Sequence, residues 1–525
     1  MLKSMSNDIF LKGSRPYLWI IGIGFLLYAQ TLLFGFTNFD DDALIQNNYS
    51  TLHSFSKITQ VFREDVFHND PDSPHYYYRP MLILSFMLDA QLGGISPFRF
   101  HLTNILLHLL AACLLFVFLK KLKYKRALSL FLSLIFTVHP ALTQAVAWVP
   151  GRNDSLLAVF ALLAFISFLD FKETKKWSAC LLHFLFFVLA LFTKETAMML
   201  PLLCLAYIYL IMKGKLFSAN NLGLISGWLV VFAFWFSLRL AAVKTAIPLA
   251  DVVRSSYLSL PAVLPYLGKI FFPFNLSAIP LLRDMTFDCG IAAFLFILNA
   301  LIFTKERRNN FVAFGILWFL LFLLPSFICK GPSGEIIILI EHRIYLSLIG
   351  LCIVLLETDL LKRLDLTNMR SFLAGLQFIL FFSLIAFNHS VIFKNGTGFW
   401  ENVVRNSPHM TIAHWKLANH YARAGLADKA EIEYKRAIEL NYWLRLAHNN
   451  LGCIYKEQNR LKEAKAEFEI EIKINPASNF AYINLGNIYY DRKNYKQAIY
   501  YYDEAIKRGG QVSPKILSAV QPYRK

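Results

Sequence analysis

The chain has few of the signals that usually mark a metal, redox or nucleic-acid-binding protein. Its seven cysteines form no C-x-x-C pair, and most stand inside apolar stretches, which argues against a structural metal or dithiol site. Lys and Arg exceed Asp and Glu, giving a formal net charge of +18. These cations do not gather into a compact patch with interleaved aromatics, so we expect no nucleic-acid partner.

Apolar residues are abundant instead, at 56% of the 525 residues. This share is too high for a soluble globular protein. Runs of about 17 to 25 apolar residues, long enough to cross a bilayer as helices, recur from Tyr17 to Asn388. From Trp400 the chain is rich in Lys, Glu, Asn and Tyr and has no such run. The sequence predicts an all-α, multi-pass membrane domain (1–398) and a water-soluble domain (399–525).

The first apolar run, 17–36, has no A-x-A-like cleavage site after it, and we expect it to remain as a span. The apolar segment 257–274 carries three prolines and a central Lys269, and is assigned as re-entrant or interfacial. About eleven spans are then predicted: 17–36, 99–119, 127–147, 155–170, 178–193, 197–212, 222–241, 289–304, 311–328, 344–357 and 371–390.

Lys and Arg set the predicted orientation, because they are enriched in cytoplasmic loops. Basic residues precede the first span, and "KKLKYKR" (120–126) follows the second, so the N-terminus is expected inside. An odd number of spans then places 399–525 outside. The first outer loop, 37–98, contains the short apolar stretch 79–94, which we expect to form a surface or re-entrant helix.

The soluble domain contains an internal repeat. Three similar segments begin at Trp415, Asn449 and Ile483, each 34 residues after the last. This is the tetratricopeptide period, with small and aromatic residues where helix pairs interlock. We predict repeats at 411–444, 445–478 and 479–512, followed by a capping helix. Such an α-solenoid offers a concave surface to protein or peptide.

Charged motifs gather at the predicted outer ends of the spans. The loop after the first span contains "FDDD", and five further motifs lie at other outer ends: Arg79-Pro80, His139-Pro140, "GRND" (151–154), Lys194-Glu195 and "EHRIY" (341–345). Placing a charged side chain in or beside the apolar part of a membrane costs free energy, and such residues usually have a function. Carboxylates beside Arg and Lys suit transfer from a lipid phosphate, because a carboxylate can take a proton from an attacking hydroxyl while cations hold the departing phosphate.

This ordered set of motifs, followed by the repeats, resembles the transmembrane O-mannosyltransferases with C-terminal tetratricopeptide repeats and their bacterial relatives. The resemblance implies a GT-C fold, a polyprenyl-phosphate-linked sugar donor, and inverting transfer to protein hydroxyls. It also implies an extracytoplasmic active site in the first loop. Since the array is short, the resemblance favours a bacterial inner-membrane protein with periplasmic repeats.

The family's acidic pair falls on Asp40 and Asp41, either of which is the expected general base, whereas Asp42 is expected to be a solvated neighbour. Either of the pair is alternatively a ligand of Mg²⁺ or Mn²⁺, which prefer oxygen donors. No other cofactor is expected. Three adjacent aspartates cannot all ionise without mutual cost, which predicts a raised pKa or a bound cation.

The other site residues follow from the remaining motifs. Donor-phosphate binding is assigned to four cations: Arg79, Arg152, Lys194 and Arg343. Supporting roles are assigned to five residues: His139, Asp154, Glu195, Glu341 and His342. Structural alternatives stay open: an Arg152–Asp154 pair, a Lys194–Glu195 pair, a snorkelling role for Arg79, and a helix-end hydrogen bond for His139.

The predicted function is therefore a membrane glycosyltransferase that uses a polyprenyl-phosphate sugar and a protein acceptor. One alternative is a non-catalytic membrane scaffold that recruits periplasmic partners through its repeats. Another is a transporter of lipid-linked sugar, which would depend on charges at the bilayer midplane, and these are scarce.

Overall fold

The computed structural model describes residues 10–70, 75–245, 248–328, 339–366 and 368–524. It divides into two compact units, Met1–Phe399 and Trp400–Lys525, which we treat separately. In the described ranges, helices account for nearly all regular structure, and this confirms the all-α prediction.

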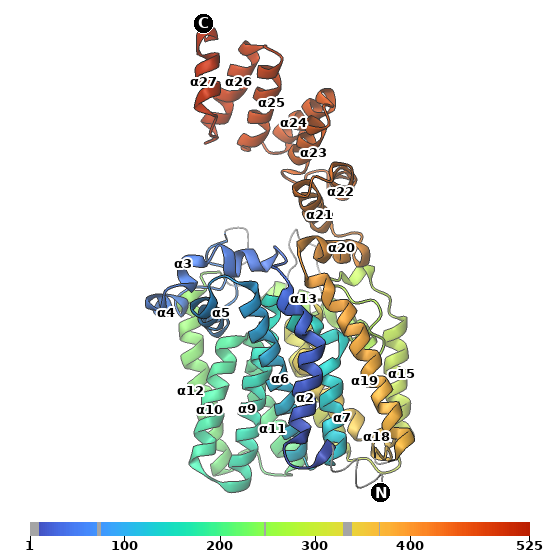
Figure 1. Cartoon of the computed structure of the whole chain (residues 1–525). Helices are drawn as coiled ribbons and strands as arrows, with labels where there is room; N and C mark the ends of the chain where they lie inside the picture. The colour runs from blue at the N-terminus through green and yellow to red at the C-terminus, as the bar shows by residue number, and fades with distance from the viewer. Residues whose placement is uncertain (1–9, 71–74, 246–247, 329–338, 367, 525) are drawn as a thin grey trace. The chain divides into compact units, whose positions relative to one another are not determined.

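The first unit is a bundle of long apolar helices (Figure 1). Five of its helical segments are long and apolar enough to cross a membrane: Arg15–Leu33 (α2 with η2), Pro97–Lys121 (α6), Val149–Thr174 (η6 with α9), Ala219–Ala242 (α12) and Met369–Phe393 (α19 with η14). A sixth candidate is the bent pair α7 (Arg126–Val138) and Pro140–Ala147, which turns by 54° at His139. A multi-pass membrane unit is therefore supported.

The other predicted spans fall on shorter helices. They are α10 (Trp177–Thr193), the run Glu195–Ile211 that includes α11 (Leu200–Ala206), α15 (Asp288–Ile302), α16 (Asn309–Leu323) and α17 (Ile344–Leu356). At 1.5 Å per residue, a helix of 15 residues is about 22 Å long, less than the hydrocarbon thickness of a bilayer. The count of eleven spans therefore stays a prediction.

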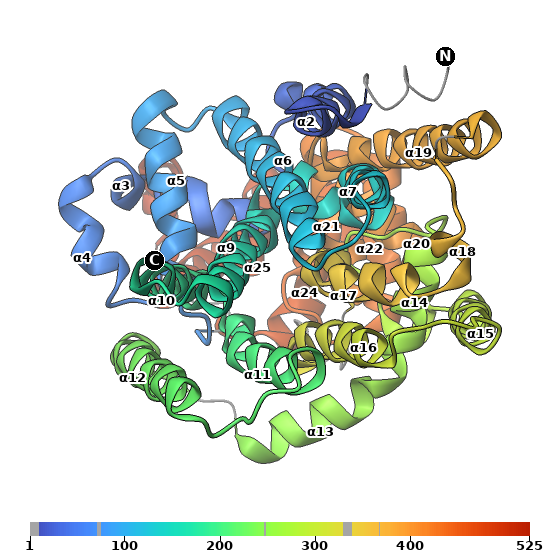
Figure 2. The same ribbon diagram turned by 90° about the horizontal axis from the view of Figure 1, so that it is seen from below.

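The predicted re-entrant segment 257–274 covers the end of one short helix and the whole of a second. These are α13 (Leu249–Ser259) and α14 (Val263–Phe271), joined by the single turn Leu260–Ala262 that contains Pro261. In the view along the bundle, α13 is seen from the side while α2, α7 and α15 are seen nearly end-on, so α13 lies across the bundle axis (Figure 2). Neither helix is long enough to cross the bilayer by itself.

The predicted first outer loop is folded at one end of the bundle. It contains α3 (Tyr49–Leu52), α4 (Ile58–Val61) and α5 (Pro80–Gly93), which lie together at that end (Figure 1). The apolar side chains of α5 pack into a small core with those of residues 44–66. The stretch 79–94 is therefore helical, and its apolar residues are held in protein.

Small residues allow one close helix crossing in the bundle. A Cβ atom on Gly350 of α17 would lie 2.4 Å from the carbonyl oxygen of Gly315 on α16, and 2.5 Å from the backbone nitrogen of Phe319. Any side chain at Gly350 would therefore force the two helices apart. This contact sets how closely α16 and α17 pack, and α17 follows directly on the turn that carries Glu341, His342 and Arg343.

The second unit consists of consecutive helix pairs. They are α21 (Thr411–Arg423) with α22 (Ala427–Leu440), α23 (Ala447–Glu457) with α24 (Leu461–Ile474), and α25 (Asn479–Asp491) with α26 (Tyr495–Lys507), followed by α27 (Pro514–Val520). Helix α20 (Gly396–Asn406) leads into this unit.

Equivalent contacts recur along the second unit with the sequence period. His414 Nδ1 lies 2.6 Å from Glu433 Oε2, and 34 residues later His448 Nδ1 lies 2.6 Å from Glu467 Oε2. Gly452 packs against the ring of Phe468, where a Cβ atom would approach to 2.6 Å. The repeat is thus a repeat of side-chain contacts as well as of sequence.

Candidate functional site

A cavity of about 290 Å³ lies at the end of the bundle that carries the folded loop. Its wall includes six of the residues predicted from the sequence: Asp40, Arg79, Lys194, Glu195, His342 and Arg343. These residues come from segments separated by up to three hundred positions along the chain. The fold therefore collects in one cavity half of the charged and titratable groups that the outer-face motifs supplied.

Local backbone geometry presents the cations of two motifs. Arg79 precedes Pro80, which disfavours helical backbone at Arg79, and it caps α5 at φ −136° and ψ 56°. Lys194 adopts extended backbone, at φ −159° and ψ 138°, between the end of α10 and the short turn that begins at Glu195. Both side chains therefore leave the chain where a helix begins or ends.

Two ion pairs hold the cavity wall together. Glu195 accepts the Nε–H of Arg79 at 3.4 Å and the backbone N–H of Tyr78 at 3.1 Å. Lys194 donates to both carboxylate oxygens of Asp154, at 2.7 and 2.8 Å. The Lys194–Glu195 pair considered from the sequence is thus replaced by two pairs to residues from other helices.

Burial lowers the pKa of two cavity residues, Lys194 and His342, and so favours their neutral forms. The pKa of Lys194 is lowered, first by burial and then by neighbouring cations, although Asp154 opposes the shift. Burial and the same cations hold the pKa of His342 well below its usual range. His342 is therefore neutral at pH 7, with its Nε2 at 3.5 Å from Asp154 Oδ2. Asp154 thus links Lys194 to His342 beneath the cavity.

The three aspartates have three different environments. Asp40 lines the cavity and is partly exposed. Asp41 is fully buried, and its Oδ2 accepts hydrogen bonds from the backbone nitrogen of Thr37, at 3.1 Å, and from the Thr37 hydroxyl. Asp42 Oδ1 accepts a hydrogen bond from Asn38 Nδ2 at 3.0 Å. Of the acidic pair, only Asp40 faces the cavity.

Asp41 is placed to hold the loop in position. Burial raises the pKa of Asp41 to about 6. The Thr37 hydroxyl that binds Asp41 also accepts the indole N–H of Trp148 at 3.1 Å, and Trp148 lines the cavity. Phe39 stacks on Trp148 with ring centroids 6.0 Å apart. Asp41, Thr37 and Trp148 thus fix the loop that carries Asp40.

Arg152 is not among the residues that line the cavity. Its guanidinium is fully buried, with Asp89 of α5 at 2.5 Å, Asn104 Oδ1 of α6 at 2.7 Å and the Phe100 carbonyl at 2.8 Å. The Arg152–Asp154 pair left open above does not form, because Arg152 pairs with Asp89 and Asp154 pairs with Lys194. The phosphate-binding role predicted for Arg152 is also corrected, since its donors are taken up in joining α5, α6 and α9.

Two supporting residues also lie outside the cavity wall. Glu341 is fully buried and accepts hydrogen bonds from Lys269 and from the backbone nitrogen of Ser277, the latter at 2.7 Å. His139 accepts the backbone N–H of Ala141 at 3.2 Å, and its Nε2 lies 3.1 Å from the Ile270 carbonyl. His139 thus has the helix-end role left open above, and Glu341 anchors the turn that precedes Arg343.

Several cavity residues were not assigned to the site from the sequence. Arg239 lines the wall and donates to the Tyr76 carbonyl at 3.1 Å. Tyr77 lies under Arg79, whose Cζ is 4.3 Å from the ring centroid. Arg239 stood out only as a charge within an apolar helix, which by itself points to a functional residue without locating it. In the part of the chain that the structure describes, no group of three His, Cys, Asp or Glu residues forms a metal-binding cluster.

Comparison with known proteins gives two kinds of match. Two tetratricopeptide repeat models match residues 447–478 and 480–508. Protein O-mannosyl-transferase Tmtc1 of Drosophila melanogaster is 35% identical over 204 residues, which are 38% of this chain and 23% of that protein. The chain is similar to protein O-mannosyl-transferases. This confirms the resemblance drawn from the motifs, together with the tetratricopeptide repeats.

Further relatives match over similar lengths. Protein O-mannosyl-transferase TMTC3 of Homo sapiens is 31% identical over 202 residues, 37% of this chain and 22% of that protein. TMTC4 of Mus musculus is 34% identical over 188 residues, 32% of this chain and 25% of that protein. The match thus spans about a quarter of each curated relative. Among solved structures, MamA matches with a TM-score of 0.21 and 20% identity, covering 29% of this chain and 83% of that one.

Proposed function

We propose that this chain is a membrane glycosyltransferase that transfers a hexose, with mannose as the first candidate, from a polyprenyl-phosphate donor to protein hydroxyl groups. The observation that carries the proposal is the cavity in which Asp40 meets Arg79, Lys194 and Arg343. Similarity to protein O-mannosyl-transferases supports the class of reaction.

The donor phosphate is assigned to the cationic part of the wall. Four cations line the cavity, namely Arg79, Lys194, Arg239 and Arg343, against the two carboxylates Asp40 and Glu195. Phosphate oxygens pair well with the planar fork of an arginine. Because Lys194 and Arg79 are already held by Asp154 and Glu195, they are fixed before the donor arrives. Such preorganisation stabilises the charge that develops on a leaving phosphate.

Asp40 is the proposed general base. The acceptor hydroxyl oxygen bonds to the anomeric carbon while the bond from that carbon to the phosphate oxygen breaks, with both electrons leaving on the lipid phosphate. Asp40 takes the hydroxyl proton, and the anomeric carbon inverts. Asp41 is assigned a positioning role, since its Oδ2 is committed to Thr37.

A divalent cation at Asp40 and Asp41 does not fit this arrangement. Asp41 is fully buried, and four cationic side chains line the wall that Asp40 shares. A dication there would be repelled, and the wall already supplies positive charge to the phosphate. The proposed transfer therefore needs no metal, and we expect it to survive treatment with EDTA.

The acceptor is proposed to be a protein or peptide that the tetratricopeptide unit binds on its concave surface. The active cavity is proposed to face the periplasm of a bacterial inner membrane, with the N-terminus in the cytoplasm and a GT-C arrangement of spans. These proposals rest on the family resemblance and on the distribution of Lys and Arg.

The decisive experiment is reconstitution. Purified protein in nanodiscs is incubated with polyprenyl-phosphate mannose or other polyprenyl-phosphate hexoses and a serine- and threonine-rich peptide, and products are read by mass spectrometry. We expect a mass increase of one hexose on the peptide, with or without EDTA. If neither transfer nor donor hydrolysis occurs with any donor, with or without Mg²⁺ or Mn²⁺, the enzyme proposal fails and a scaffold role is favoured.

A further inference from the structure

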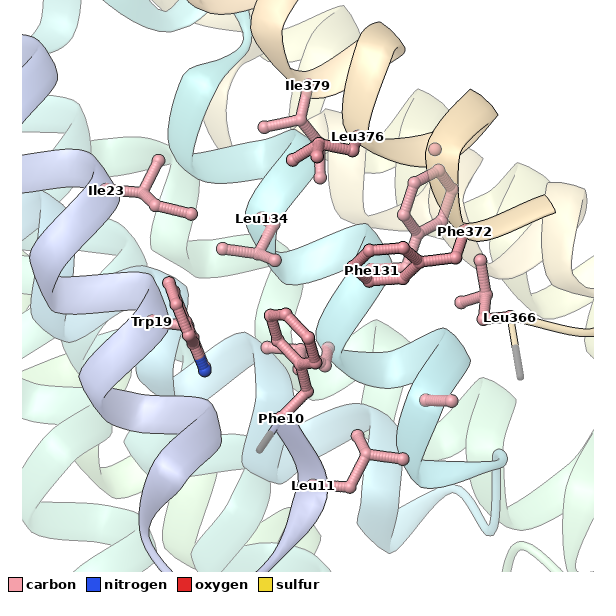
Figure 3. Close-up of a pocket in the computed structure, with 13 residues that line it drawn as sticks. Phe10, Leu11, Trp19, Ile23, Phe131, Leu134, Leu366, Phe372, Leu376 and Ile379 are labelled. Carbon is pink, nitrogen blue, oxygen red and sulfur yellow. The ribbon is translucent and has the colours of Figure 1, made fainter. Parts of the chain in front are cut away.

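A second cavity, of about 340 Å³, lies between α2, α7 and α19. Its wall is apolar, with Trp19 and Ile23 from α2, Leu134 from α7, and Phe372 and Leu376 from α19 facing the space (Figure 3). A volume above about 300 Å³ is in the range of ligand pockets. Because the wall offers almost no hydrogen-bonding group to a polar ligand, it suits a hydrocarbon chain.

This cavity is at the opposite end of the bundle from the candidate active site. Helices α2, α7 and α19 all begin at the end where it lies, whereas the folded loop with Asp40 follows the far end of α2 (Figure 1). The 19 helical residues Arg15–Leu33 separate the two ends by about 28 Å. A lipid phosphate near the mouth of this cavity cannot be the phosphate held at Asp40.

Cations stand close in sequence to the residues that line the cavity, at the end that we call its mouth. Among the described residues they are Lys12, Arg15, Lys125, Arg126 and Arg370, with the carboxylate of Asp365 beside Leu366. None of the first turns of α2, α7 and α19 contains an acidic residue. Helix N-termini add partial positive charge at the same place.

Arg126 connects the mouth to the cavity wall. It is followed directly by Ala127, which lines the cavity, and its Nη2 donates to the Gly13 carbonyl at 2.5 Å. Its Nε is buried and has no hydrogen-bond partner among the described residues. Its Cζ lies 5.7 Å from the ring centroid of Phe116 on α6, so the guanidinium is held close to the start of α7.

We propose that this cavity binds one acyl chain of an anionic phospholipid, with the lipid phosphate at the basic mouth. Basic pockets between helices on the cytoplasmic side are typical sites for anionic headgroups, and charge orientation predicts that side for this end. The site is independent of the proposed transferase activity, since it shares no lining residue with the first cavity.

The test is native mass spectrometry of detergent-purified protein titrated with dioleoylphosphatidylglycerol or dioleoylphosphatidylcholine. We expect phosphatidylglycerol to bind at least tenfold more tightly. The double variant Arg126→Gln with Arg370→Gln should lose at least tenfold in phosphatidylglycerol affinity and leave phosphatidylcholine unchanged. Ala127→Phe, which fills the cavity, should weaken the binding of both lipids.

Matched controls separate the site from general lipid adhesion. Lys176→Gln with Lys215→Gln removes two exposed cations from the same end of the bundle, and Leu181→Phe enlarges an exposed apolar residue on α10. Both control proteins should bind like the wild type. Equal affinity of the wild type for the two lipids, or displacement of phosphatidylglycerol by equimolar undecaprenyl phosphate, would overturn the proposal.

Discussion

The two neighbouring aspartates offer a sharp test of the site, because the same substitution should have different consequences at each. Asp40→Asn keeps the size of the side chain but removes the ability to accept a proton. A positioned general base contributes about 10² to 10⁴-fold to a reaction rate. Since Asp40 is partly exposed at the cavity wall whereas Asp41 is fully buried, we expect the substitution at Asp40 to affect folding less than the same substitution at Asp41.

Asp41→Asn should act mainly on stability. Its amide oxygen can still accept the two hydrogen bonds from Thr37, but the NH₂ group then takes the place of Oδ1. That atom is buried and has no hydrogen-bond partner among the described residues. An unsatisfied buried polar group costs about 1 to 3 kcal/mol. We therefore expect a lower unfolding temperature, with part of the transfer activity retained.

The assay measures hexose transfer to peptide under single-turnover conditions, together with thermal unfolding of the same preparations in nanodiscs. Asp42→Asn is the matched control, since Asp42 Oδ1 accepts one hydrogen bond, from Asn38, that an amide oxygen can still accept, and the substitution should change neither quantity by much. The reasoning is refuted if Asp40→Asn keeps wild-type turnover, or if Asp41→Asn abolishes turnover while its unfolding temperature is unchanged.

Further predictions concern the electrostatics, the buried pair and the repeats. Burial raises the pKa of Asp41 from 3.8 to about 6. Between these two pH values the folded state keeps a proton on Asp41 that the unfolded state has lost. The free energy of unfolding should therefore fall as pH rises from 4 to 6. Thermal unfolding should show this fall in the wild type and much less of it in Asp41→Asn. Arg152→Met leaves Asp89 buried without its cation and should lower the free energy of unfolding, measured by chemical denaturation, by about 3 to 5 kcal/mol. If the double variant Arg152→Met with Asp89→Leu recovers stability, the pair is structural. Arg343→Gln should raise the KM for the polyprenyl-phosphate donor at least tenfold in the same transfer assay; an unchanged KM would contradict phosphate binding. A Cβ atom at Gly486 would lie 2.5 Å from the ring of Tyr502, so the side chain of Gly486→Leu would overlap that ring. The variant should destabilise the repeats by about 1 to 3 kcal/mol. The control Ile432→Ala changes an exposed residue and should have little effect on melting followed by circular dichroism.

Much of the architecture was predictable because its signals are local. A long apolar run predicts a membrane helix wherever it occurs, and the 34-residue period predicts helix pairs without knowledge of their neighbours. The predicted spans 178–193 and 289–304 match α10 and α15 to within two residues at each end, whereas 311–328 runs past the end of α16 at Leu323 into the turn Leu324–Ile328, a boundary that hydropathy does not mark.

The membership of the site was only half predictable. Motif position indicated Asp40, Arg79, Lys194, Glu195, His342 and Arg343, and all six line one cavity. The same reasoning could not find Arg239, whose sequence context is an ordinary apolar helix. It also placed Arg152 at the site, because a charge at a helix end has the same sequence context whether it faces a cavity or a buried partner.

The sequence by itself determined the helical class, the membrane character, the repeats and which charged residues stand at the helix ends. Only the tertiary structure decided which charges pair: Arg152 with Asp89, Lys194 with Asp154, and Arg79 with Glu195. It alone showed that Asp40 faces the cavity while Asp41 is buried against Thr37. The physical reason is that hydropathy and periodicity are sums over neighbouring residues, whereas ion pairing depends on distances of a few ångströms between segments far apart in the chain.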